Sequence, residues 1–175
     1  MSVESLFLEC AADTLLEHLG RIETCLGKLT EDQIWARGHE NENAVGNLVL
    51  HLTGNVRQWI VAGLGGAPDN RFRDAEFAAR RGPAAGELAG NLRATVESAV
   101  GVIRNLNTGQ LTEIHEIQKY RVSGVYAVLH VVEHFAQHTA QIIFGTKMLT
   151  GSDLGFYRHL SAPSNASEQN PGQKP

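Results

Sequence analysis

Residues 122–149 read VSGVYAVLHVVEHFAQHTAQIIFGTKML, and this stretch decides the expected fold. Its apolar side chains recur at helical spacing and would occupy much of the circumference of a helix. A helix that is apolar so widely has to be covered by more than one neighbour. Three earlier segments show the same periodicity, so the sequence predicts an all-α protein built as a four-helix bundle.

The three other predicted helices precede this stretch and are separated by typical helix breakers. The first carries apolar residues over 8–29 in a nearly heptad pattern. The second runs over 45–60 and is stopped by Gly-Gly-Ala-Pro at 65–68. The third starts behind Pro83, a good first-turn residue, and its apolar stripe extends over 88–106. The order and length of these segments suit one bundle domain.

Two connections and the C-terminus complete the expected organisation. The link over 69–82 is long for a helix–helix connection, which allows a crossover rather than a simple up-down order. Residues 114–121 lack a helical stripe and can be extended. Residues 161–175 are rich in Ser, Asn, Pro, Gln and Gly and have nothing to bury, which is typical of a disordered tail. We therefore expect a bundle domain over 1–160, followed by a flexible tail.

Composition limits the classes of function. The 175 residues carry a net charge of -4 without a basic patch, which argues against nucleic-acid binding. No apolar run approaches the roughly 20 residues that span a bilayer, and the N-terminus does not resemble a signal peptide. Cys10 and Cys25 fall in one predicted helix, on the order of 22 Å apart, so they cannot pair within it. We expect a protein of the reducing cytoplasm.

Three histidines carry most of the functional information. His134 and His138 are four residues apart, so both imidazoles lie on one face of a helix and can grip one metal ion. If the helix that carries His51 is a neighbour, three neutral nitrogens can converge and leave the far side of the metal for water or substrate. Spacing alone leaves two alternatives: the pair His130 and His134, or histidines that merely lie solvated on a polar stripe.

The surroundings of these histidines suggest a half-buried polar pocket. His51 lies beside Asn47 and Asn55 at the margin of an apolar face, and the fourth helix has a similar margin. Gln141 falls about 20° from His134 around the helix, so its amide can serve as a hydrogen-bond partner of the site. Two such margins that face each other would form a pocket rather than a dry core.

The remaining polar residues are interpreted more simply. His18 faces away from the apolar stripe of its helix, so we expect it at the surface. A dense charge cluster, Arg71, Arg73, Asp74 and Glu76, follows the Gly-Gly turn. We interpret this cluster as a solvated loop, and the alternative is a substrate-facing loop at the mouth of the pocket.

Two segments resemble a known family. Residues 43–52, NAVGNLVLHL, look like the second helix of the DinB-like (YfiT-like) metalloenzyme superfamily, of which this chain resembles an uncharacterised subgroup. Residues 134–142, HFAQHTAQI, look like its fourth helix, whose pattern is His, three residues, His, two residues and Gln. The family often has His-Arg-Gly-Gln where this chain has HTAQ at 138–141. The resemblance covers roughly 3–158.

The resemblance implies a four-helix bundle with a divalent metal, nickel or zinc, held by His51, His134 and His138. It thereby selects the 134/138 pair. Some members transfer or use low-molecular-weight thiols, as bacillithiol S-transferases and mycothiol-dependent maleylpyruvate isomerase do. The expected function is therefore a metal-dependent enzyme that acts on a small-molecule substrate, either with such a thiol or as a hydrolase.

Several points of function stay open at this level. No residue is assigned as catalytic, because Glu76 and Glu133 are only candidates for a general base. The rival function is a non-catalytic, metal-binding, dimeric helical bundle. We expect a homodimer in either case, because the fourth helix is widely apolar and Trp59 and Phe144 add aromatic area that interfaces favour. Nucleic acid and membrane are not expected partners.

Overall fold

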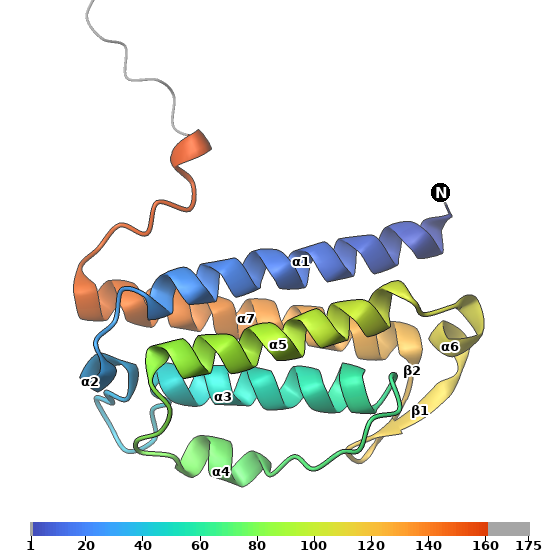
Figure 1. Cartoon of the computed structure of the whole chain (residues 1–175), viewed down its shortest axis with the longest axis horizontal. Coiled ribbons are helices and arrows are strands. Elements are labelled where there is room, and N and C mark those ends of the chain that lie inside the picture. The colour runs from blue at the N-terminus through green and yellow to red at the C-terminus, as the bar shows by residue number, and fades with distance from the viewer. Residues whose placement is uncertain (1, 161–175) are drawn as a thin grey trace, which may run out of the picture.

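The computed structural model describes residues 2–160 and confirms the predicted four-helix bundle (Figure 1). The long helices are α1 Val3–Leu26, α3 Val45–Val56, α5 Ala85–Arg104 and α7 Gly124–Thr150. The shorter helices are α2 Glu31–Ile34, α4 Arg73–Ala78, α6 Thr108–Thr112 and the 3₁₀ turn η2 Arg158–Leu160. A π-helix, η1 Arg57–Ala62, continues α3. The tail predicted for 161–175 lies outside the described residues.

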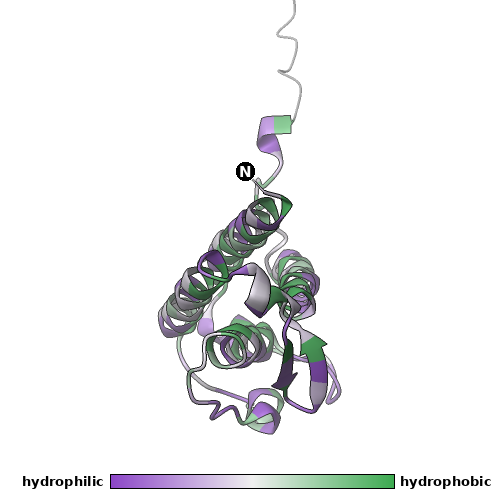
Figure 2. Ribbon diagram, turned by 90° about the vertical axis from the view of Figure 1, so that its right-hand side faces the viewer, coloured by the Kyte–Doolittle hydropathy of each residue, from purple (hydrophilic) through white to green (hydrophobic). Residues whose placement is uncertain are grey.

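The bundle contains the predicted crossover. Helices α1 and α3 each pack against both α5 and α7. Figure 1 shows α3 and α5 running in the same direction, opposite to α1 and α7. Because α3 and α5 are parallel, the chain between them has to return along the bundle, and it places α4 beside α3 on the way. Figure 2 views the bundle nearly end-on, with α4 outside the four long helices.

The segment before α7 is extended, as the sequence allowed. Strands β1 Ile114–Ile117 and β2 Tyr120–Ser123 form an antiparallel hairpin in which Ile114 pairs with Ser123 and Ile117 with Tyr120. The two-residue turn contains Gln118 at a φ of 55°, in the left-handed region. The hairpin lies beside the N-terminal end of α7 (Figure 2).

The start and end of α7 are set by local hydrogen bonds. The Ser123 hydroxyl accepts a 3.2 Å bond from the backbone N–H of Tyr126, which caps the first turn. At the other end Gly151 adopts a φ of 64°, and its N–H donates to the carbonyl of Lys147. These caps fix the limits of the helix that presents His134 and His138.

The core between the four helices is apolar and continuous. Its fully buried side chains include Leu15, Leu19, Ile22, Leu52, Leu92, Val96, Val131 and Phe135. Each buried side chain of this size contributes about 1.5–3 kcal/mol relative to an exposed one. The bundle therefore has a driving force for folding that does not require a metal.

Two expectations about single residues change. Trp59 is only 2% exposed, so it belongs to the interior and cannot contribute to a dimer surface, whereas Phe144 is 68% exposed. His18 is half-buried against the Phe135 side of the core rather than at the surface. Both cysteines are free, as predicted. No helix among the described residues is long and apolar enough to cross a membrane.

Candidate metal centre

The structure brings His51, His134 and His138 together. One nitrogen from each ring can be chosen so that all three lie within 4.8 Å of one another. The Nε2 atoms of His51 and His134 are 3.0 Å apart across the α3–α7 contact. His130 is not part of the cluster, because its ring lies on Trp59 with a centroid distance of 4.0 Å. Of the two pairs that spacing allowed, the 134/138 pair therefore meets His51.

Glu76 from α4 fixes the orientation of His51. Its Oε2 lies 2.9 Å from His51 Nδ1, and the two side chains are 10% and 5% exposed. Arg71 Nη2 lies 3.0 Å from the same nitrogen, but it has a shorter 2.7 Å bond to Glu76 Oε2, so Nδ1 is assigned as the donor to the carboxylate. The lone pair of the ring is then on Nε2, which faces His134. A carboxylate behind a histidine is the usual arrangement at metal sites, where it sets the tautomer and raises the basicity of the ligand.

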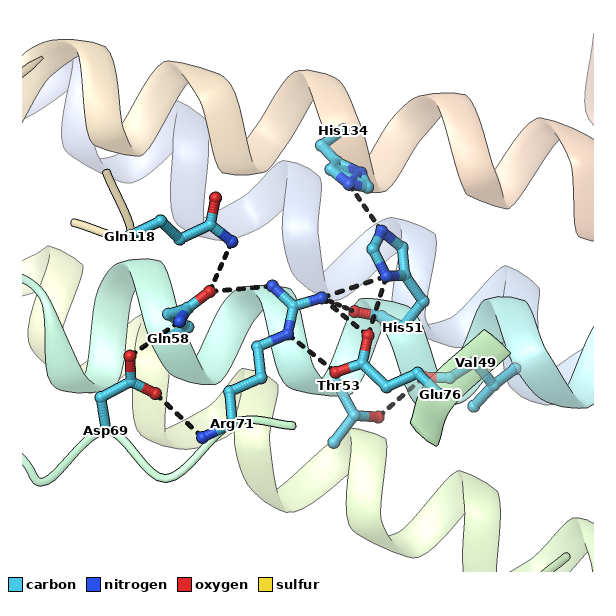
Figure 3. A network of polar contacts seen from close by, with 9 residues as sticks. All are labelled: Val49, His51, Thr53, Gln58, Asp69, Arg71, Glu76, Gln118 and His134. Carbon is cyan, nitrogen blue, oxygen red and sulfur yellow. Dashed lines mark hydrogen bonds and ion pairs between the residues drawn. The ribbon is translucent and has the colours of Figure 1, made fainter. Parts of the chain in front are cut away.

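Glu76 is in turn held by Arg71, which precedes α4. The guanidinium donates from Nε to Oε1 and from Nη2 to Oε2, both at 2.7 Å, as a two-pronged ion pair (Figure 3). Burial alone would raise the pKa of the Glu76 carboxyl, but the bonds from Arg71 and His51 outweigh it and lower the pKa. The carboxylate therefore stays ionised at neutral pH.

The hydrogen-bond network continues from Arg71 to the hairpin turn. Arg71 Nη1 donates to Gln58 Oε1 at 3.0 Å, and Gln118 Nε2 donates to the same oxygen at 2.5 Å. Gln58 comes from the π-helix, and its amide also donates to Asp69 at 2.7 Å. Figure 3 shows these contacts as one chain of polar groups that runs from Gln118 to His134. The π-helix thus contributes a link to the three-histidine cluster.

The solvated-loop interpretation of the charge cluster is wrong for two of its members. Arg71 and Glu76 are almost completely buried in their ion pair, whereas Arg73 and Asp74 are exposed. Of the two candidate bases only Glu76 reaches the site. Glu133 is exposed on α7, where Gln137 donates a 3.4 Å bond to it. Since Glu76 already accepts bonds from Arg71 and His51, it orients the site rather than serving as a free base.

A glycine makes room for this ion pair. A Cβ at Gly54 would lie 2.0 Å from Glu76 Oε1 and 2.8 Å from Arg71 Nε, distances that no side chain tolerates. Gly54 lies one turn after His51, so it shares the face of α3 that looks toward α4. In the sequence, a glycine one helical turn after a candidate ligand is the signal that another part of the chain, here the Arg71–Glu76 ion pair, packs against this face of α3.

Gln141 orients the third histidine. Its Oε1 accepts a 2.7 Å bond from Nδ1 of His138, which leaves the Nε2 lone pair of His138 free. The partner of Gln141 is therefore His138, three residues away on the same helix, rather than His134. Gln141 and His134 lie at nearly the same angle around the helix, but seven residues separate them by two turns along its axis.

His134 is the least satisfied group in the cluster. Its Nδ1 is buried and has no hydrogen-bond partner within the described part of the chain. Burial, with repulsion from His138, His51, His130 and Arg71, lowers the pKa of His134 to about 3. The pKa of His138 is lowered as well, mainly by burial. Both rings are therefore neutral at physiological pH, which is the form that binds metals.

The donor set suits a divalent ion. Metal–nitrogen bonds of about 2.0–2.1 Å in tetrahedral geometry separate ligand nitrogens by roughly 3.3 Å, close to the 3.0 Å between His51 and His134. Within residues 2–160 no fourth His, Cys, Asp or Glu joins the three histidines. Three protein ligands are typical of catalytic metal sites, whereas structural sites have four. The cluster is thus compatible with metal binding.

Comparisons with known proteins agree with this architecture. A family model described as "Protein of unknown function (DUF1572)" matches residues 2–166. The crystal structure of a conserved protein from Enterococcus faecalis is similar, with a TM-score of 0.71 and 16% identity over 87% of this chain and 99% of that one. A DinB-like protein from Bacillus subtilis, YjoA, gives a TM-score of 0.63 and 17% identity over 84% and 96%. No curated protein matches the chain.

Proposed function

Since the chain belongs to the DUF1572 family and has the fold of DinB-like proteins, we propose that it is a metal-dependent enzyme whose divalent ion is held by His51, His134 and His138. The observation that carries the proposal is the convergence of three neutral imidazoles from two helices. Two of these rings have their tautomers set by neighbours that leave Nε2 free. Such an arrangement has no evident role in packing, because the apolar core lies elsewhere.

The proposed ion is nickel or zinc, both of which imidazole suits. When bound through neutral ligands, the ion keeps its full positive charge and lowers the pKa of a thiol or water beside it, which supplies a nucleophile near neutral pH. The protein's own contribution is orientation. Glu76 and Arg71 hold His51, Gln141 holds His138, and the Trp59 ring lines the cavity beside His51 and His134.

The proposed reaction class is attack by this nucleophile on a small-molecule substrate. With a low-molecular-weight thiol the reaction is a transfer, and with water it is a hydrolysis. The absence of a free carboxylate next to the three histidines within the described chain favours a nucleophile that needs no general base once its pKa is lowered. A thiol meets this condition more easily than water, because its pKa starts lower.

Elemental analysis tests the metal assignment. We expect about one divalent ion per chain in the wild type and none in His134→Ala. His130→Ala is the matched control, because His130 lies one turn away on the same helix and outside the cluster. It should keep its metal. Full metal in His134→Ala, or loss of metal in His130→Ala, would show that the ligands are wrongly assigned.

Chelation separates the enzyme from a bundle that binds metal only for stability. The buried apolar core does not involve the histidines, so the chelated protein should keep its helical circular dichroism. It should at the same time lose any thiol-transfer or hydrolytic activity that the metal-loaded protein shows. Loss of helix on chelation would instead support the structural role, which is the rival function.

A further inference from the structure

A small cavity adjoins the three histidines. It has a volume of about 260 Å³, and both His51 and His134 line it. Polar and aromatic side chains also line it: Asn55, Trp59, Arg73, Tyr120, Tyr126 and His130. They come from α3, the π-helix, the first residue of α4, the hairpin and α7. A cavity of roughly 150 Å³ holds a benzene molecule, so this one has room for a small substituted ring or a short-chain acid.

The charges around the cavity have one sign. Two arginines line it, and no Asp or Glu of the described chain does. The charge of Arg71 is compensated by Glu76, with which it forms the buried ion pair. Arg73 has no such partner among residues 2–160, and its guanidinium lies over the ring of Phe77 at 4.8 Å. One uncompensated positive charge therefore lies at the wall of the cavity, even before the ion of the proposed function adds to it.

Two buried polar atoms in the wall have no partner. The indole Nε1 of Trp59 and the side-chain oxygen of Asn55 make no hydrogen bond within the described residues. Their side chains are 2% and 3% exposed. An unsatisfied buried donor or acceptor costs about 1–3 kcal/mol, so structures usually provide a partner for it. A ligand in the cavity would be such a partner: an acceptor group for Trp59 and a donor group for Asn55.

The remaining wall is aromatic. The Trp59 ring lies 4.0 Å from His130 and 6.1 Å from Tyr120, measured between centroids. Tyr126 stacks on His130 with an interplanar angle of 9°. Such walls favour a flat or apolar body, since aromatic faces pack against planar groups in offset or tilted arrangements. Tyr120 and Tyr126 are more than half exposed, so they mark the entrance.

We propose that this cavity binds a small organic carboxylate with a flat or apolar body, and that Arg73 and the Trp59 N–H hold its anionic group. The inference rests on the proposed function, because it treats the cavity as the substrate compartment of the metal centre. Arg73 supplies the charge that selects an anion, Trp59 supplies a directed donor, and the aromatic wall supplies apolar contact. Asn55 selects ligands that carry an additional donor.

A fluorine NMR titration tests this proposal. The probes are 4-fluorobenzoate and 4-fluorobenzamide, which have the same shape and differ in charge, added to zinc-loaded protein. We expect benzoate to bind at least about tenfold more tightly than the amide. Arg73→Gln should raise the Kd for benzoate about fivefold, the value of one partly exposed ion pair. Arg81→Gln is the matched control, because Arg81 is exposed on the same link and outside the cavity.

Trp59→Phe keeps an aromatic ring and removes the donor, so it should weaken the binding of benzoate more than that of the amide, because a hydrogen bond to a charged acceptor is stronger than one to a neutral acceptor. Metal content is measured on the same samples. A protein that cannot be loaded with zinc counts against the proposed function. Equal affinity for the two probes in a zinc-loaded sample, or an equal effect of Arg73→Gln and Arg81→Gln, overturns the present inference.

Discussion

The substitution Glu76→Gln separates the effect of the buried negative charge from the effect of the side chain's shape. Glutamine keeps the size of the side chain and one acceptor oxygen, but it removes the negative charge. In the wild type that charge accepts two 2.7 Å bonds from Arg71 and one 2.9 Å bond from His51. The variant therefore leaves the Arg71 guanidinium buried without its counter-ion.

Two magnitudes follow from this geometry. The Arg71 and Glu76 side chains are 4% and 10% exposed, and removal of one partner from a buried ion pair costs about 3–5 kcal/mol. We expect the metal-free variant to lose about 3 kcal/mol of its free energy of unfolding. His51 also loses the carboxylate that sets its tautomer, and the loss of such a partner weakens metal binding about 10–100-fold. The second effect corresponds to roughly 1.4–2.7 kcal/mol.

Two measurements check these values. Urea unfolding of the chelated proteins, followed by circular dichroism, gives the change in stability, and competition with a chelator gives the metal affinity. Glu133→Gln is the matched control, because Glu133 is exposed and lies next to His134 in sequence. It should change neither quantity. A stability loss below about 1 kcal/mol for Glu76→Gln, as for a surface pair, would refute the argument that the buried charge is structural.

Three further predictions follow from the structure. Gly54→Ala should separate Glu76 from its partners, because the new Cβ would lie 2.0 Å from the Oε1 atom; we expect at least about 2 kcal/mol of destabilisation in urea unfolding. The pKa of His134 is about 3 in the folded protein, so below about pH 6.5 the unfolded chain binds more protons than the folded one. The free energy of unfolding of the chelated protein should therefore fall as the pH is lowered from 6.5, and it should fall less steeply in His134→Ala. A homodimer stays a prediction: light scattering should give twice the chain mass, and Phe144→Glu, at an exposed apolar position, should reduce it to a monomer.

Most of the fold follows from apolar periodicity. The four long helices appear where the sequence shows a 3.6-residue repeat, and the second, continued by the π-helix to Ala62, ends shortly before the Gly-Gly-Ala-Pro stretch that was expected to stop it. The π-helix over Arg57–Ala62 was not predicted, because six residues are too few to distinguish a wider turn from an α-helix by pattern. Helix α4 was not predicted either, since it is short and mostly exposed and so carries no apolar stripe.

The site was predictable only where its residues share a helix or a family pattern. Four-residue spacing indicated a histidine pair but left 130/134 and 134/138 open, and the resemblance selected the second pair together with His51. Arg71 and Glu76 meet His51 across 20 and 25 positions of sequence, through a link whose composition resembles that of a solvated loop. Charge alone cannot show that two residues are buried together. The one local indication in the sequence was Gly54, whose missing side chain leaves room for the Glu76 carboxylate.

The parallel course of α3 and α5 has a consequence for how such proteins diversify. An up-down bundle joins successive helices by a tight turn, but here the chain has to travel back along α3, about 18 Å for its 12 residues. This return path passes His51 and supplies Arg71, Arg73 and Glu76, while the apolar core is built without it. The segment over 66–84 therefore sets the polar surroundings of the histidines without supplying a side chain to the buried core cluster. A change of sequence in this segment would alter the charges and hydrogen bonds around the three histidines while the apolar contacts between the long helices stay the same.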